Sequence, residues 1–221
     1  DTGMVLSDWN GFNVLHTAAS RVGGLMLGCV PDEGGKSTNE ILAGAKSGEI
    51  SIVYLLGADE IDTSQLDNAF VIYQGHHGDA GAHKASVILP SAAYTEQNGI
   101  FVNTEGRIQI AKRAAFPPGE AKEDWAILRA LSGELDAVLP YDTQDELRHS
   151  LQDSNNAFLA IDTVEPAAWS EFGVSGAIDP APFNSPISNF YMTDPISRAS
   201  ETMAKCVDEI IGTAEATGTD G

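Results

Sequence analysis

The chain has 221 residues, of which 43% are hydrophobic, and its formal net charge at pH 7 is −20. This length and apolar content allow a buried core in one large domain or two small ones. The acidic balance argues against a nucleic-acid-binding protein, because a phosphate backbone attracts clustered Lys and Arg. We also expect no membrane-spanning helix, since no run of about 18 apolar residues is free of charge.

The charge distribution and the cysteine content limit which partners and which cellular compartment the protein can have. Residues 1–113 hold 13 Asp and Glu against 7 Lys and Arg, whereas residues 114–221 hold 19 against 5. We interpret the second part as a solvated acidic surface, and the alternative is a surface that meets a basic partner. Cys29 and Cys206 stand far apart, so we expect a reducing compartment, no cysteine-bound cluster within the chain, and two small buried side chains.

The amino-terminal part predicts two helices. Residues 1–10 lack the basic and then apolar pattern of a signal peptide. Apolar residues at helical spacing predict an amphipathic helix over 11–23, followed by a short strand over 24–30. Ser37 and Glu40 fit a capping box, which predicts a helix to about Lys46 that ends at Gly48.

Three apolar runs, over 50–56, 70–73 and 86–89, predict strands, the last of which ends at Pro90. Continuous apolar strands separated by short helical patterns indicate parallel strands covered on both faces. We therefore predict an α/β fold with a doubly wound, mainly parallel sheet and helices on both faces. Two further extended runs, over 100–103 and 107–112, predict a β-hairpin.

Polar side chains follow two of the predicted strands. Ligands of such sheets bind beyond the carboxyl ends of the strands, so that edge is the candidate site. Its residues are Asp59, Glu60, His76, His77 and Asp79. The glycines around them match neither a dinucleotide-binding fingerprint nor a phosphate-binding P-loop, so neither kind of site is supported.

The remainder predicts a helical carboxyl-terminal extension. Helices are expected over 120–135 and from Thr143 to about Leu151, where a second capping box begins. Residues 155–186 suggest an extended strap, and 212–221 a disordered tail. Asp194 and Pro195 begin a helix with an apolar stripe. We divide the chain into an α/β domain, 1–140, and an acidic extension, 141–221, with a terminal helix over 194–211.

Several motifs together resemble one known family. The chain is similar to the large iron-sulfur subunit of respiratory complex I, the NADH:quinone oxidoreductase, in its mitochondrial and alphaproteobacterial form. The resemblance covers most of the chain, and we expect it to correspond to the carboxyl-terminal part of that subunit. The motifs are WNGFNVLHTAASRVG at 9–23, LLGADEID at 55–62, GHHGDAGAH at 75–83, ILPSAAYTE at 88–96, VNTEGR at 102–107 and FYMTDPISRASETMAKC at 190–206.

The resemblance implies a role in electron transfer without chemistry in this segment. The family carries 2Fe-2S and 4Fe-4S clusters in an amino-terminal cysteine-rich region, which is absent here, so we expect no cofactor and no catalytic residue in this chain. It also implies a hetero-oligomer with other peripheral-arm subunits and no direct membrane insertion. The expected location is the cytoplasmic face of a bacterial inner membrane or the matrix face of the mitochondrial one.

The same family is related to molybdopterin oxidoreductases such as formate dehydrogenases, whose pterin dinucleotide is understood to be absent from complex I. Mapped by motif, the old cofactor edge falls on 57–59, 75–79 and 103–107. Its candidates are Asp59, His76, Asp79 and Arg107. A pyrophosphate requires cations, and this edge offers mostly acids. We therefore expect a vestigial pocket.

Other interpretations of single motifs are weaker. His76, His77, Asp79 and His83 suggest a zinc or iron site, but a glycine-rich loop places ligands poorly, and we expect no metal. Glu105 and Arg107 resemble an acid with an electrostatic clamp; a structural ion pair in the hairpin is favoured.

Two function classes follow. The first is a non-catalytic structural and docking segment of the complex I subunit. The alternative is a cofactor-domain fragment of a molybdopterin oxidoreductase, with a retained pterin pocket.

Overall fold

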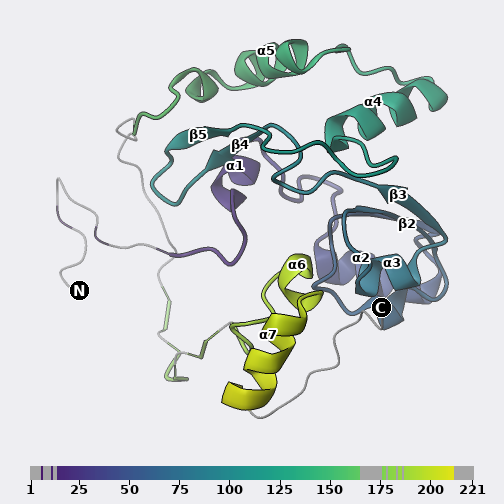
Figure 1. Ribbon diagram of the computed structural model, residues 1–221, viewed down its shortest axis with the longest axis vertical. Coiled ribbons are helices and arrows are strands. Elements are labelled where there is room, and N and C mark those ends of the chain that lie inside the picture. Colours follow the sequence, from purple (N-terminus) through teal and green to yellow (C-terminus); the bar gives the residue numbers. More distant parts are fainter. Residues whose placement is uncertain are drawn as a thin grey trace. The chain divides into compact units, whose positions relative to one another are not determined.

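A computed structural model describes residues 6, 11, 14–164, 176–177, 179–182, 184–185 and 187–211. Contacts between Cα atoms divide the chain into two compact units. The hairpin unit comprises Asp1–Val30, Gly99–Ala111 and Thr143–Asp179; the sheet unit comprises Pro31–Asn98, Lys112–Asp142 and Pro180–Gly221. Both units draw on separate stretches of the chain (Figure 1). The division at residue 140 stays a prediction.

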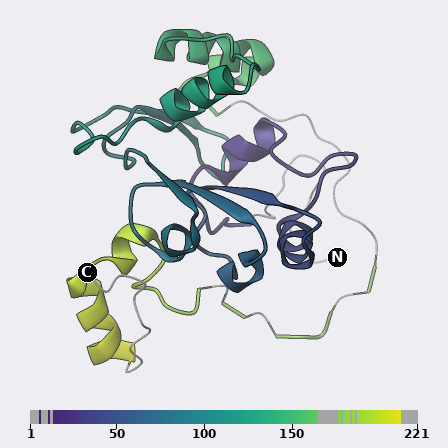
Figure 2. The ribbon, with the colours of Figure 1, turned by 90° about the vertical axis from the view of Figure 1, so that its right-hand side faces the viewer.

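The sheet unit is built on three parallel strands. β1 (Ile52–Leu56), β2 (Phe70–Gly75) and β3 (Val87–Pro90) are hydrogen-bonded in the order β1-β2-β3. Ile52 pairs with Phe70, and Ile72 pairs with Val87. The predicted α/β class is confirmed, because this parallel sheet is flanked by helices and accompanied by a separate hairpin (Figure 2).

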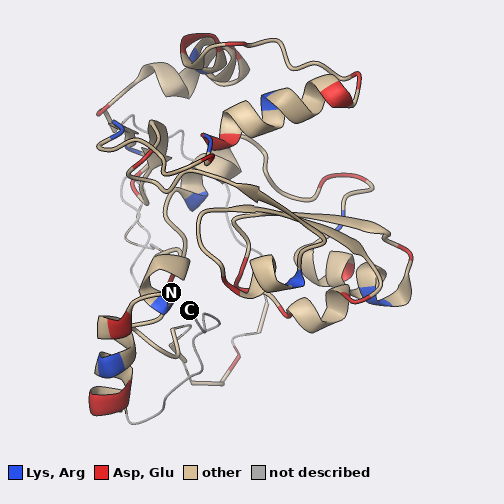
Figure 3. Cartoon of the chain, turned by 45° about the vertical axis from the view of Figure 1, so that its right-hand side comes forward, with Lys and Arg blue, Asp and Glu red and all other residues tan. Residues whose placement is uncertain are grey.

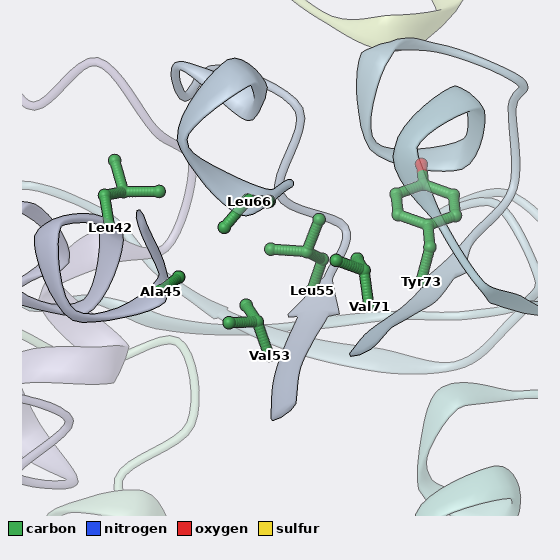
Figure 4. Close-up of a cluster of buried hydrophobic side chains, with 7 residues drawn as sticks. All are labelled: Leu42, Ala45, Val53, Leu55, Leu66, Val71 and Tyr73. Atoms are coloured by element: carbon green, nitrogen blue, oxygen red, sulfur yellow. The ribbon is translucent and has the colours of Figure 1, made fainter. Parts of the chain in front are cut away.

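The helix that follows the predicted capping box at Ser37 packs on the sheet. In α2 (Thr38–Ser47) the hydroxyl of Ser37 accepts from the backbone N–H of Glu40, and Gly48 ends the helix with φ of 83°. A 3-10 turn, η1 (Thr63–Leu66), and α3 (Ala80–Lys84) connect the strands. The core lies between α2, η1 and the strands (Figure 4). Its buried members are Leu42, Ala45, Val53, Leu55, Leu66, Val71 and Tyr73.

α4 (Asp124–Glu134) starts beside the carboxyl end of β2. The fully buried Gln74 donates from Nε2 to the Asp124 carboxylate at 2.7 Å, and its Oε1 accepts from the Tyr54 hydroxyl. Gln97 donates to the other Asp124 oxygen at 3.0 Å. This network anchors the start of α4 to the sheet through polar side chains.

The carboxyl-terminal segment is helical in three pieces. They are α6 (Pro195–Arg198), α7 (Glu201–Cys206) and the π-helical turn η3 (Val207–Ile211). Asp194 caps α6, as the sequence predicts. Ser200 then takes an extended conformation and caps α7, so the helix predicted over 194–211 is interrupted at that residue.

The hairpin unit contains β4 (Gly99–Val102) and β5 (Ile108–Ala111), which pair antiparallel as predicted. It also contains α1 (Arg21–Met26), α5 (Gln144–Ser154) and the 3-10 turn η2 (Asn156–Leu159). Val102, Ile108 and Phe158 form its buried cluster. The capping box predicted at Thr143 is present at the start of α5.

Two local predictions near the amino terminus are wrong. Residues 14–20 are not helical, and α1 instead covers Arg21–Met26, where a strand start was expected. Ser20 has a left-handed φ of 60°, which prevents a helix from running through it. A Cβ on Gly23 would lie 3.1 Å from Val102 Cγ2, so this glycine permits α1 to approach β4 closely and does not end a helix.

The other differences concern the cysteines and the strap. Cys29 is exposed and Cys206 is half-buried, so neither is the buried apolar residue that was expected. The predicted strap includes η2 and an isolated bridge between Ile108 and Ile161. Residues 165–175 of the strap, and the predicted disordered tail at 212–221, lie outside the described residues.

Candidate functional site

Asp59 lies beyond the carboxyl end of β1 and is only 6% exposed. Its Oδ2 accepts from the Tyr73 hydroxyl at 2.9 Å, and its Oδ1 accepts from the backbone N–H of Gly81 at 2.7 Å. A Cβ on Gly81 would lie 2.7 Å from Asp59 Oδ1 and from the Tyr73 ring. The glycine therefore lets α3 close over the carboxylate, which is satisfied within the chain.

Asp79 lies beyond β2 and is 5% exposed. As the N-cap of α3, it accepts from the backbone N–H of Ala80 at 2.8 Å through Oδ1. Its Oδ2 accepts from Nε of Arg198 in α6. Both oxygens are thus engaged, one by the local helix start and one by a cation 119 residues away.

Arg198 joins the two strand ends. Its Nη2 donates to Glu60 Oε1 at 3.0 Å, and its Nη1 lies 3.5 Å from the Met192 carbonyl oxygen. Burial acts to lower the pKa of Arg198, but the hydrogen bonds to Asp79 and Glu60 outweigh it and raise the pKa above its ordinary value. The side chain is therefore a permanent cation at this edge.

Tyr73 lies beneath this network and is 1% exposed. Besides its bond to Asp59, its hydroxyl lies 3.2 Å from the His77 carbonyl oxygen. Burial and then the hydrogen bond to Asp59 raise the pKa of Tyr73 above its usual value of 10. The phenol therefore stays protonated and acts as a hydrogen-bond donor.

His76 and His77 line a separate pocket of about 380 Å³ in the sheet unit. Their Nδ1 atoms lie 2.6 Å apart, so one ring donates to the other. Burial, followed by the neighbouring His77, lowers the pKa of His76 and favours its neutral form. The remaining lining comes from the last residues of β2 and β3, from the residues that follow β3 and from the loop before α4. These are Gly75, Pro90, Ser91, Ala93, Glu96, Pro118, Glu120 and Ala121.

Arg107 belongs to the hairpin unit. It donates to the Asp162 carbonyl oxygen at 2.8 Å and lies 3.7 Å from Glu105, in the ion pair that the sequence favoured. The loop itself is shaped by Asn103, whose Oδ1 accepts from the backbone N–H of Glu105 and of Arg107, each at 3.0 Å. Gly106 has φ of 83°, the left-handed conformation that this reversal requires.

The structure therefore brings together only some of the predicted site residues. Asp59, Glu60 and Asp79 converge through Tyr73 and Arg198, whereas His76 faces the adjacent pocket. Within the described ranges, no group of three or more His, Cys, Asp or Glu side chains could hold a metal ion. His83, the fourth residue of the suggested metal site, lies in the last turn of α3.

Sequence reasoning missed Tyr73 and Arg198. Tyr73 was assigned only as an apolar strand residue, although its phenol requires a partner once the strand is buried. Arg198 lies in the predicted terminal helix, and nothing local indicates its distant partners. The one available signal was the excess of acids at the strand ends, which requires a cation from elsewhere.

Acidic residues occur on helices and loops of both units (Figure 3). No helix among the described residues is long and apolar enough to cross a membrane.

Comparisons with known proteins identify relatives over nearly the whole chain. Residues 1–134 match the family model described as molybdopterin oxidoreductase. Residues 163–206 match the family model for the carboxyl-terminal region of the G subunit of NADH-ubiquinone oxidoreductase.

Individual relatives agree with both matches. The G subunit of NADH-quinone oxidoreductase from Rickettsia conorii is 45% identical over 91% of this chain and 28% of its own length. The mitochondrial 78 kDa subunit of NADH-ubiquinone oxidoreductase from Candida albicans is 46% identical over 90% of this chain and 28% of its own length. The mitochondrial NADH dehydrogenase [ubiquinone] iron-sulfur protein 1 of Solanum tuberosum is 42% identical over 93% and 27%. The chain thus spans less than a third of these relatives.

Proposed function

From the membership of this chain in the molybdopterin oxidoreductase family, on the branch of the NADH-quinone oxidoreductase G subunits, we propose that it is a structural and docking segment of that electron-transfer subunit. In this proposal the segment performs no chemistry of its own. The carboxyl ends of its parallel strands form a vestigial cofactor pocket, marked in the sheet unit by Asp59, His76 and Asp79; Arg107, the fourth predicted candidate, belongs to the hairpin unit.

The observation that carries the proposal is the internal bonding of the strand ends. Asp59 and Asp79 are buried carboxylates whose oxygens accept hydrogen bonds from within the sheet unit. A dinucleotide with two pyrophosphates would meet these acids where it requires donors and cations. Arg198, the cation at this edge, is already engaged by Asp79 and Glu60. The strand ends are therefore better suited to being closed by the chain's own residues than to binding an anionic ligand.

The iron-sulfur clusters of the parent subunit would lie outside this sequence. Each cluster requires about four thiolate or histidine ligands, and Cys29 and Cys206 belong to different units. Electrons from NADH would pass to quinone through the remainder of the subunit, and this segment would support it. The assembly would be a peripheral hetero-oligomer with other peripheral-arm subunits of complex I. It would lie on the cytoplasmic or the matrix face of the membrane.

An exposed apolar face of the sheet supports the docking role. The pairing of Ile52 with Phe70 and of Ile72 with Val87 places these side chains on one face. Ile52 is 62% exposed, Leu56 52% and Phe70 48%. Parallel sheets are normally covered on both faces, so this face is suited to further polypeptide of the assembly.

Metal and pterin analysis of the native protein tests the proposal. The protein is purified with all chains that accompany it, and iron, molybdenum, tungsten and pterin are measured per mole. We expect iron without molybdenum, tungsten or pterin, together with NADH-dependent quinone reduction. A stoichiometric pterin with molybdenum or tungsten would overturn the proposal and support the alternative, a cofactor-domain fragment of a formate dehydrogenase-like enzyme.

A further inference from the structure

The strand ends of the sheet unit surround one guanidinium, that of Arg198. We define the Arg198 clasp as the Arg198 side chain with its three acceptors: the Asp79 carboxylate, the Glu60 carboxylate and the Met192 carbonyl oxygen. The acceptors come from the loop after β1, the loop after β2 and the residues before α6. The clasp thus connects three segments of the sheet unit.

The acceptor that requires a cation most is Asp79. Its side chain is 7% exposed, and a buried carboxylate without a counter-charge is costly. The N-cap bond from Ala80 satisfies one oxygen only. Lys84, a cation in the last turn of α3, is paired with Asp67 instead. Arg198, whose side chain is 18% exposed, is therefore the partner that compensates Asp79.

The geometry selects a guanidinium over an ammonium. Nε, Nη1 and Nη2 of Arg198 are directed to three acceptors on different segments. A planar fork of five N–H donors meets such an arrangement, whereas a lysine ammonium is a point charge on a flexible stem. Glu60 is more exposed, at 62% of its side chain, so the bond to Asp79 contributes most.

A capped helical turn, α6, positions Arg198. α6 has four residues and is too short to be stable alone. Asp194 caps it by accepting from the backbone N–H of Ile196 at 2.9 Å and of Ser197 at 3.1 Å. Within the described residues of 187–211, the hydrogen bonds to the strand ends all pass through Arg198. The segment therefore depends on this one side chain for its polar attachment.

We propose that the carboxyl edge of the sheet is a guanidinium receptor, occupied within the chain by Arg198, and that this clasp holds the two loops and the carboxyl-terminal segment closed. The inference goes beyond the proposed function, since it concerns what fills the edge in this chain whether or not the parent protein is a complex I subunit.

Hydrogen exchange on the native protein, purified with its accompanying chains, tests the clasp. The variants are Arg198→Gln, which removes the guanidinium, and Lys205→Gln, the control, which removes an exposed positive charge from the same segment. Arg198→Gln should raise amide exchange in 57–60, 76–84 and 194–206 by about tenfold or more, because it unpairs a buried charge. Lys205→Gln should leave it unchanged. Equal exchange in both variants would overturn the proposal.

Three further variants keep the test decisive. If Arg198→Gln does not accumulate, Arg198→Lys is compared with Lys205→Arg, and only the former should raise exchange, by severalfold. In Arg198→Ala, millimolar ethylguanidinium should restore protection of 76–84, whereas ethylammonium should not. Equal rescue by both cations would show a site for positive charge alone and would overturn the assignment to a guanidinium.

Discussion

The strand-end loops of the sheet unit and the turn of the hairpin, which the family motifs single out, obtain their structure in different ways. In the sheet unit, Asp79 and Glu60 are bonded to Arg198, which is 119 and 138 residues away in the sequence. In the hairpin unit, Arg107 pairs with Glu105, and Asn103 sets the turn through two backbone N–H groups nearby. The strand-end loops are held by distant contacts around buried charge, whereas the hairpin turn is shaped by local contacts at the surface, with one longer-range bond from Arg107 to the Asp162 carbonyl oxygen.

This difference indicates what each loop tolerates. Loss of any partner of a buried carboxylate that has a single long-range cation is strongly destabilising, whereas an exposed ion pair contributes little to stability. The buried hydrophobic clusters also differ in size: seven buried residues form the cluster of the sheet unit, and three form that of the hairpin unit. We expect the hairpin unit to depend on its few apolar residues, and the strand ends of the sheet unit to depend on their polar ones.

The largest expected effect comes from Phe158→Ala, which truncates one of the three buried side chains of the hairpin-unit cluster. Phe158 is 2% exposed, so the free energy of unfolding of that unit should fall by about 3–5 kcal/mol. Hydrogen exchange should rise in 99–111 and 144–159 and stay unchanged in β1 to β3. Leu159→Ala, at a side chain that is 61% exposed, is the control and should have little effect. An equal rise in β1 to β3 would contradict separate cores.

Tyr73→Phe should have the next largest effect, because it removes the donor to buried Asp59. The free energy of unfolding of the sheet unit should fall by about 1–3 kcal/mol. Tyr94→Phe is the control, since Tyr94 is 62% exposed. No difference between the two variants would mean that the bond to Asp59 does not stabilise the edge.

The same phenol predicts a pH dependence. Its pKa in the folded chain is raised above the unfolded value of 10, so its stabilising contribution is complete below pH 10. That contribution should be lost as the pH rises from 10 toward the raised folded-state pKa. Denaturation of wild-type protein between pH 9 and 11 should therefore show a steeper loss of stability than that of Tyr73→Phe. Parallel curves would contradict the raised pKa.

The smallest effects are expected in the hairpin loop. Asn103→Ala removes an acceptor of two backbone N–H groups and should cost about 1 kcal/mol. Arg107→Gln should cost about 0–1 kcal/mol, because both the ion pair with Glu105 and the hydrogen bond to the Asp162 carbonyl oxygen are exposed. Exchange of the amides of Glu105 and Arg107 measures both. A larger effect of Arg107→Gln would reverse the assignment of this loop to Asn103.

Local signals in the sequence predicted the regular elements well where short-range physics decides. The capping boxes at Ser37 and Thr143, the strands and the hairpin turn at Gly106 all depend on neighbouring residues. The resemblance to the complex I subunit is confirmed by the relatives, because several ordered motifs carried it.

The errors arise where tertiary contacts override the local pattern. Gly23 and Gly24 were interpreted as a helix end, but both lie inside α1, where the lack of a Cβ on Gly23 makes room for Val102. The periodicity of the sequence does not reveal the Arg198 clasp, since its two carboxylates are more than 100 residues from Arg198. Burial of Asp59 likewise depends on Gly81 and Tyr73, which local patterns treat as a turn and a strand.

The most direct test of a structural role is activity per assembled protein in the variant Asp59→Asn. The native protein is isolated with its accompanying chains, and both its amount and its NADH-dependent quinone reduction are measured. If Asp59 has only a structural role, the variant should yield less assembled protein, with an unchanged rate of quinone reduction per mole of assembly. A full yield of assembled protein with a much lower rate would contradict the account, because Asp59 would then act in the chemistry.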